Sequence, residues 1–168
     1  FGQVEGGILP GLIGYEMGQA AMGDAFAWLS QLTNTPLREL SARAAALPTA
    51  TGQEELALDW INGCRSPHND TTLRGVIGGV AMSTTPEALY RATAAGIACG
   101  GRDILESFTG AGVPVDRIVA TGGLPHAAPD LIQTFADVRL GFSCPDSCAT
   151  NHVLALVAPH PDFFAWHF

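Results

Sequence analysis

Two adjacent glycines, Gly122 and Gly123, stand where the chain could hold a small molecule. They follow a short apolar run, Ile118 to Ala120, which predicts a strand buried on both faces. A helix should follow from Pro129, because the apolar residues after it recur at helical spacing. Residues without Cβ let the backbone approach a flat or anionic ligand at the end of a strand. The unit therefore predicts a ligand site, although a glycine pair here also serves as a purely steric turn.

A second group of residues has the chemistry of a metal site. Cys144, Cys148 and His152 are spaced so that one helix face would present two thiolates and an imidazole, which are zinc ligands. Pro145 interrupts such a helix and a fourth ligand is missing, so we predict no metal site. The four cysteines of the chain form no C-x-x-C pair and are too few for a disulfide scaffold, which indicates reduced thiols.

The charge balance restricts the class of ligand. Eight Lys and Arg against sixteen Asp and Glu give a formal net charge of -8, which disfavours nucleic acid as a partner. ATP is not excluded, because proteins grip nucleotides with backbone N–H groups, helix ends and magnesium rather than with net charge. The apolar runs are too short to span a bilayer and no export signal is visible, so we expect a cytoplasmic protein without a membrane partner.

The elements that would position a ligand follow from the hydrophobic pattern. The 168 residues, 47% of them hydrophobic, suffice for the core of one domain. We expect two short strands or a hairpin within residues 1–17, then helices over 18–32 and 36–46. Gly18 and Gly23 would each cost the first helix about 1 kcal/mol relative to alanine. Their presence predicts that another helix or a ligand approaches closely there.

The second half of the chain predicts a crossover between parallel strands. Residues 75–82 have the pattern of a strand, and residues 86–108 that of the longest helix, with Thr84 and Glu87 at capping-box spacing. Small side chains fill the middle of this helix, which predicts very close packing against a neighbour. The order strand, long helix, strand at 118 is that of a βαβ unit, so we expect a parallel component.

Four segments, in this order, resemble the C-terminal domain of the FGGY carbohydrate kinases, with wording nearest to the ribulokinase branch. They read G-Q-V-E-G-G-I-L-P-G-L-I-G-Y-E-M-G-Q-A-A-M-G-D-A-F-A-W, L-D-W-I-N-G-C-R-S-P, L-Y-R-A-T-A-A-G-I-A-C-G-G-R-D-I and I-V-A-T-G-G-L-P-H. The resemblance runs from about residue 2 to Val138, so we expect a partial C-terminal kinase domain over 1–138 and a non-family tail over 139–168. A shifted reading frame would explain the tail; a genuine lineage-specific tail is the alternative.

The resemblance implies an α/β fold, one half of an actin-like, ribonuclease H-like ATPase with a mixed sheet and flanking helices. It also implies phosphoryl transfer from ATP with Mg²⁺, in which an aspartate takes the proton of a sugar hydroxyl. In this branch the acceptor is the C5 hydroxyl of L-ribulose, in L-arabinose breakdown. The chain matches neither the family's catalytic aspartate, nor its second phosphate loop, nor its N-terminal domain. We therefore expect it to be inactive alone and to need that domain as a partner; homo-oligomerisation of the complete enzyme stays open.

The resemblance also implies roles for five residues. Gly122 and Gly123 match the family's adenosine motif, where the backbone passes close to the nucleotide. Gly23 and Ala27, one helical turn apart, match positions that line the ATP pocket in the related glycerol kinases, although close helix packing explains them equally well. Glu16 matches a glutamate that contacts the sugar, and a carboxylate can accept two hydroxyl hydrogen bonds. A surface charge at the start of a helix is the alternative for Glu16.

Three positions depart from the family pattern. Ala128 stands in place of an asparagine that can hydrogen-bond the nucleotide, Ala95 in place of a glutamate, and Cys64 in place of an arginine. Two functions remain as alternatives to the phosphorylation of L-ribulose. One is a kinase of the same family for D-ribulose, xylulose or glycerol. The other is a non-catalytic module that binds a nucleotide.

Overall fold

The computed structural model describes residues 2–6, 10–48, 52–113, 115, 118, 120–121, 128–140, 156–157, 162–164 and 166–167. Its helices and strands, in chain order, are β1 (Gly2–Glu5), β2 (Ile13–Glu16), α1 (Met22–Thr33), α2 (Leu37–Ala45), β3 (Leu56–Leu58), β4 (Val76–Gly78), α3 (Pro86–Gly110), β5 (Ala120–Thr121), α5 (Pro129–Leu140), β6 (Leu156–Val157), β7 (Asp162–Phe164) and β8 (Trp166–His167).

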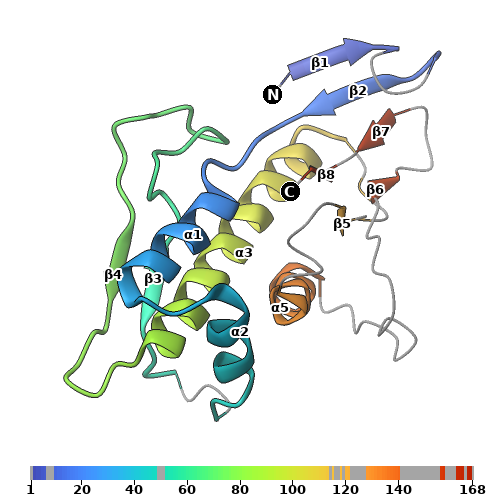
Figure 1. Cartoon of the computed structure of the whole chain (residues 1–168). Helices are drawn as coiled ribbons and strands as arrows, with labels where there is room; N and C mark the ends of the chain where they lie inside the picture. The colour runs from blue at the N-terminus through green and yellow to red at the C-terminus, as the bar shows by residue number, and fades with distance from the viewer. Residues whose placement is uncertain are drawn as a thin grey trace.

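The long helix α3 is the element around which the others pack. Figure 1 shows it running through the middle of the molecule, and it contacts α1, α2, α5 and the β3–β4 ribbon. It begins with Thr85, whose side chain accepts a hydrogen bond from the Ala88 N–H, and with Pro86 in the first turn. Both residues are favoured at a helix start, because the first N–H groups have no partner within the helix.

The main core lies where four helices meet. Its side chains come from one face of each helix and from Ala128, the residue before α5: Met22, Ala25, Phe26, Leu29, Leu40, Ala44, Tyr90, Ala94, Ile97, Ala98, Ala128, Leu131 and Phe135. Burying one Leu or Phe side chain fully is worth about 1.5–3 kcal/mol, so this cluster is the main source of stability for the helical layer. A second cluster, formed by Ile104, Leu105, Phe108 and Val113, packs Tyr15 and Met17 against the far end of α3. Strand β2 is thereby anchored to the same helix that organises the core.

Short sheets flank the helices. Strands β1 and β2 pair antiparallel, with Gly2 opposite Glu16, and β7 pairs parallel with β2 through Ile13 and Asp162, giving the order β1-β2-β7-β6 (Figure 1). Strands β3 and β4 form an antiparallel ribbon, and β5 pairs parallel with β8. The four-stranded sheet is therefore mixed, as the family resemblance implied.

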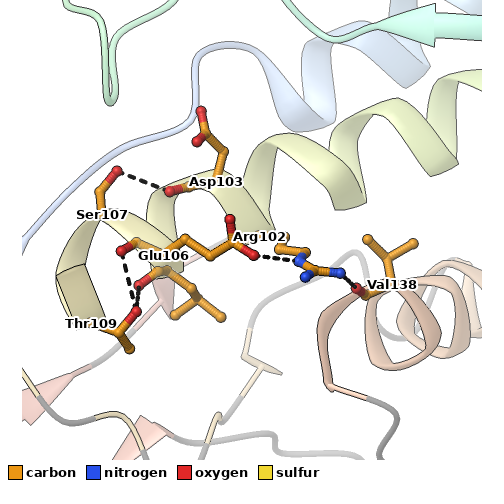
Figure 2. Close-up of polar contacts among 7 residues, drawn as sticks. Arg102, Asp103, Glu106, Ser107, Thr109 and Val138 are labelled. Atoms are coloured by element: carbon orange, nitrogen blue, oxygen red, sulfur yellow. Dashed lines mark hydrogen bonds and ion pairs between the residues drawn. The ribbon is translucent and has the colours of Figure 1, made fainter.

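Polar contacts fasten α5 to its neighbours. Figure 2 shows the Arg102 guanidinium between the Glu106 carboxylate, 2.6 Å away, and the Val138 carbonyl oxygen near the end of α5, 3.2 Å away. A cation is favourable there because the carbonyls of the last helical turn are unpaired and carry partial negative charge. At the other end of α5, the Ser41 hydroxyl of α2 donates a hydrogen bond to the Asp130 carboxylate.

Several predicted elements occur close to their expected bounds. The hairpin at the start of the chain, the helix over 36–46, the longest helix and the helix from Pro129 are confirmed. The close packing predicted for the middle of α3 is also confirmed, because a Cβ on Gly96 would lie 2.3 Å from the Ala57 carbonyl oxygen. No helix within the described ranges is both long enough and apolar enough to traverse a membrane.

Three local expectations are wrong. The first helix begins at Met22 rather than at residue 18, so Gly18 lies in the connection before it. Thr84 does not cap α3, because its hydroxyl binds the Glu55 carboxylate and accepts a hydrogen bond from the Ala81 N–H; Thr85 caps instead.

The third error concerns the crossover. Among the described residues, β4 and β5, on either side of α3, belong to different sheets, because β4 pairs with β3 while β5 pairs with β8. Sequence reading missed β3, which supplies β4 with an antiparallel partner on its own side of α3. Parallel pairing does occur, between β2 and β7 and between β5 and β8.

Candidate functional site

The predicted sugar-binding residue, Glu16, ends strand β2 with its side chain exposed. Its Oε1 atom lies 3.3 Å from Nη2 of Arg65, and both side chains are largely in solvent. Water and salt weaken such a pair, so it restrains the carboxylate little and leaves it available as an acceptor. Both lone-pair-rich oxygens can therefore receive hydrogen bonds from a polyol.

The predicted nucleotide residues Gly23 and Ala27 lie one turn apart on α1, on its exposed side. The opposite side of α1 buries Met22, Phe26 and Leu29 in the core. Gly23 has no side chain and Ala27 only a methyl group, so these two positions add little steric bulk to that side of α1. This low relief is compatible with the predicted contact to a nucleotide, which stays a prediction.

The second predicted nucleotide feature, Gly122 and Gly123, lies outside the described residues. Its two flanking elements, β5 and α5, are described and have the predicted types. At the start of α5, Ala128 is fully buried and its carbonyl oxygen accepts a hydrogen bond from the Leu131 N–H. The placement of the glycine pair beside a nucleotide stays a prediction.

The connection between β2 and α1 joins Glu16, the predicted sugar ligand, to the helix that carries Gly23 and Ala27, the predicted nucleotide residues. Along it, the Gly18 N–H donates to Ser66 Oγ at 3.2 Å, and a Cβ on Gly18 would lie 3.0 Å from Nη1 of Arg65. The Gln19 amide nitrogen donates to the Ile97 carbonyl oxygen of α3 at 2.7 Å. The close approach predicted at Gly18 is therefore real, but the neighbour is an arginine in a loop.

Sequence reasoning missed Asp59, which is 8% exposed and accepts the other hydrogen bond that the Gln19 amide nitrogen donates. Burial raises the pKa of its carboxyl, an effect that the Gln19 hydrogen bond opposes and the nearby Asp103 carboxylate reinforces. A Cβ on Gly100 would lie 2.2 Å from Asp59 Oδ2, so the carboxylate occupies a notch that only glycine leaves open. The small residues of α3 were the one available signal.

Glu16, Gly23 and Ala27 thus lie on consecutive elements, and a loop that carries Asp59, Arg65 and Ser66 contacts the connection between them. We call residues 59–66 the clamp loop. Cys64 in this loop is a buried free thiol whose Sγ lies 3.3 Å from the Ser66 carbonyl oxygen, so the residue that replaces the family's arginine has a packing role.

Metal-binding side chains do not gather in the part of the chain that the structure describes, where no three His, Cys, Asp or Glu residues form a potential site. Cys144, Cys148 and His152 fall outside it. Cys99 is a free thiol on α3.

Comparison with known proteins decides the family. The model of the FGGY family of carbohydrate kinases, C-terminal domain, matches residues 1–144. This chain belongs to that family. The resemblance stated from the sequence is confirmed, and with it the α/β fold class.

Curated FGGY relatives are named as ribulokinases. The ribulokinase of Bacillus licheniformis is 40% identical over 149 residues, which are 82% of this chain and 27% of the relative. That of Geobacillus thermodenitrificans is 45% identical over 151 residues, again 82% of this chain and 26% of the relative. That of Mycolicibacterium smegmatis is 38% identical over 164 residues, or 89% of this chain. The chain therefore spans about a quarter of the length of the relatives it matches.

Solved FGGY structures share the fold. A xylulose kinase from Rhodospirillum rubrum has a TM-score of 0.59 and 25% identity, covering 71% of this chain and 24% of that one. A xylulose kinase from Brucella ovis has a TM-score of 0.58 and 23% identity, covering 68% and 24%. The chain covers 24% of each of these two kinases, which agrees with a match to one part of a larger kinase.

Proposed function

We propose that this chain is part of an ATP-dependent kinase that converts L-ribulose to L-ribulose 5-phosphate, and that it supplies one side of the substrate site. The observation that carries the proposal is the arrangement at β2 and α1. An exposed carboxylate, Glu16, ends the strand, and the exposed small residues Gly23 and Ala27 lie in the first half of the next helix. Ribulokinase relatives 40–45% identical over this same region support the choice of sugar.

In the proposed reaction the C5 hydroxyl oxygen of ribulose attacks the γ-phosphorus of ATP, and the bond from that phosphorus to the ADP oxygen breaks. Positioning and electrostatic stabilisation account for most of the catalysis in such transfers. Glu16 would accept hydrogen bonds from sugar hydroxyls and fix the direction of the acceptor. Gly23 and Ala27 would lie against the nucleotide, with Gly122 and Gly123 passing close to its adenosine.

The proton of the hydroxyl needs a base, and we assign that base to the part of the relatives that this chain does not match. Magnesium would be held chiefly by the ATP phosphates and by that same part, since the described residues offer no cluster of metal-binding side chains. When bound, the ion shields the charge on the phosphoryl group. The chain alone should therefore show no turnover, and cytoplasmic ATP and sugar would be its small-molecule partners.

The test uses a hybrid kinase, in which residues 2–138 of this chain replace the matching segment of the Geobacillus thermodenitrificans ribulokinase. We expect the hybrid to phosphorylate L-ribulose in preference to D-ribulose, xylulose and glycerol, and the purified 168-residue chain to show no activity above background. In the hybrid, Glu16→Ala should raise the KM for L-ribulose about 10- to 100-fold, because a hydrogen bond to a charged group is worth about 1.5–3 kcal/mol.

The control is Glu39→Gln, which removes an exposed carboxylate that is likewise paired with an arginine, on the surface of α2. Its KM for the sugar should stay at the value of the unmodified hybrid. An unchanged KM in Glu16→Ala would refute the sugar-binding role. Preference for xylulose or glycerol would refute the assignment of the sugar, and turnover by the chain alone, after contamination controls, would refute its dependence on a second domain.

A further inference from the structure

We propose that Gln19 and Asp59 are positioning residues for sugar recognition: they hold the segment that carries Glu16 without touching the sugar themselves. The inference rests on the proposed function, because it takes Glu16 as the sugar ligand. It adds a buried polar pair to the site and assigns a purpose to the clamp loop.

Gln19 ties the β2–α1 connection to two other elements at once. Its Nε2 atom donates to the Ile97 carbonyl oxygen of α3 at 2.7 Å and to the carboxylate of Asp59 at the start of the clamp loop. Its Oε1 atom is buried without a hydrogen-bond partner among the described residues. A buried amide oxygen left unpaired is costly, so the hold on Gln19 comes from its two donated hydrogen bonds.

Asp59 cannot easily move away from Gln19. Its side chain is 8% exposed and fits the notch at Gly100, where a Cβ would lie 2.2 Å from Oδ2 and 2.7 Å from the Gln19 amide nitrogen. Helix α3 therefore walls the pair in on one side. A buried carboxylate with one side-chain donor is expensive to keep, which argues that the contact serves a geometric purpose.

The far end of the clamp loop meets the same connection. Ser66 Oγ accepts a hydrogen bond from the Gly18 N–H, and the Arg65 guanidinium lies beside both Gly18 and Glu16. The Arg65–Glu16 pair is exposed and weak, so it cannot fix the backbone of Glu16 by itself. Tyr15 and Met17 already pack the residues on either side of Glu16 against the far end of α3. The two hydrogen bonds of Gln19 add a second tie between α3 and the connection, on the side that leads to Gly23.

The proposal predicts different behaviour for two substitutions of Asp59. Asp59→Ala removes the acceptor and frees the Gln19 amide. Asp59→Asn keeps an acceptor, because its Oδ1 atom can still receive the Gln19 hydrogen bond. A residue with only a packing role would not distinguish loss of the acceptor from its conservation in this way.

The first measurement uses the 168-residue chain and needs no ligand. In Asp59→Ala, NMR-detected exchange of the Gly18 N–H and of the Gln19 side-chain amide protons should become about tenfold faster than in the unmodified chain. Asp59→Asn and the surface control Glu39→Gln should stay near the unmodified rates. If Asp59→Ala does not fold, Gln19→Met, of similar length, removes the amide instead and should accelerate the Gly18 exchange. Unchanged exchange in both variants overturns the proposal.

The second measurement separates this inference from the proposed function. In the hybrid kinase, Asp59→Ala should raise the KM for L-ribulose about tenfold with the KM for ATP unchanged, and Asp59→Asn should restore it. If Glu16→Ala raises the sugar KM but Asp59→Ala does not, the positioning role is wrong and the function stands. If Glu16→Ala leaves the sugar KM unchanged, the sugar site itself is wrong. If Asp59→Ala raises the KM for L-ribulose and the KM for ATP equally, Gln19 and Asp59 have only a general structural role and the proposal is wrong.

Discussion

Gly96 in the middle of α3 allows a sharp test of the packing that supports the site. A Cβ added there would lie 2.3 Å from the Ala57 carbonyl oxygen and 3.0 Å from the Ala57 carbonyl carbon of strand β3. Real Cβ atoms essentially never approach another atom within 3.0 Å, and a backbone carbonyl cannot swing aside as a flexible side chain can. Gly96→Ala must therefore push β3 and α3 apart.

Two effects of opposite sign decide the outcome. Alanine is favoured over glycine inside a helix by about 1 kcal/mol. Overpacking a close contact typically costs about 1–3 kcal/mol and occasionally more, and the cost should be at the upper end where the obstacle is backbone. We expect Gly96→Ala to lower the free energy of unfolding by about 1–2 kcal/mol.

The matched control is Gly110→Ala, at the last residue of the same helix. A Cβ at Gly110 would have no atom within 4 Å, so only the propensity gain remains, reduced by the position at the helix end. Urea unfolding of the 168-residue chain, followed by circular dichroism, measures both variants. A Gly96→Ala chain as stable as the unmodified one, or more stable, would show that β3 does not press on α3 as described.

Three further predictions follow from other elements. Ala27→Gln on the exposed side of α1 should leave the free energy of unfolding within about 0.5 kcal/mol of the unmodified value, because glutamine is a good helix former. The same change should weaken ATP binding by the hybrid kinase, measured calorimetrically, while Gln31→Lys one turn further along should not; equal ATP affinity would remove Ala27 from the nucleotide site. Thr85→Ala should lower the free energy of unfolding by about 1 kcal/mol because it removes the cap of α3, whereas Thr85→Ser keeps the hydroxyl and should retain most of the stability in thermal unfolding. An equal loss of stability in both variants would reject the cap. Because the folded-state pKa of Asp59 is raised above its usual 3.8, the folded chain binds the extra proton, and its stability should fall as pH rises from about 4 through that raised pKa. Asp59→Asn cannot ionise, so its stability relative to the unmodified chain should improve over that interval in urea titrations; a difference independent of pH would contradict the burial of the charge.

The helices of this protein are determined largely by local sequence. Apolar spacing after Pro86 and Pro129 predicts α3 and α5, and Pro36 marks the start of α2. These signals suffice because periodicity and helix-start residues act over a few positions. The family, and with it Glu16, Gly23 and Ala27 as site candidates, followed from the order of four segments. The short strands were harder, because a strand of three residues has little pattern of its own and depends on its partner. Sequence analysis accordingly missed the three-residue strand β3, and it wrongly placed β4 and β5 in one sheet.

Tertiary structure alone decided how the site is held. Gln19 and Asp59 are 40 positions apart and meet only because the clamp loop and α3 converge at Gly100. No local pattern distinguishes a buried aspartate from a solvated one; its burial depends on which helix passes beside it. The sequence by itself determined which residues could recognise a sugar and a nucleotide. Packing against α3 determined that the connection after Glu16 is tied down by the Gln19–Asp59 pair, since long-range contacts follow from the folded backbone and not from spacing along the chain.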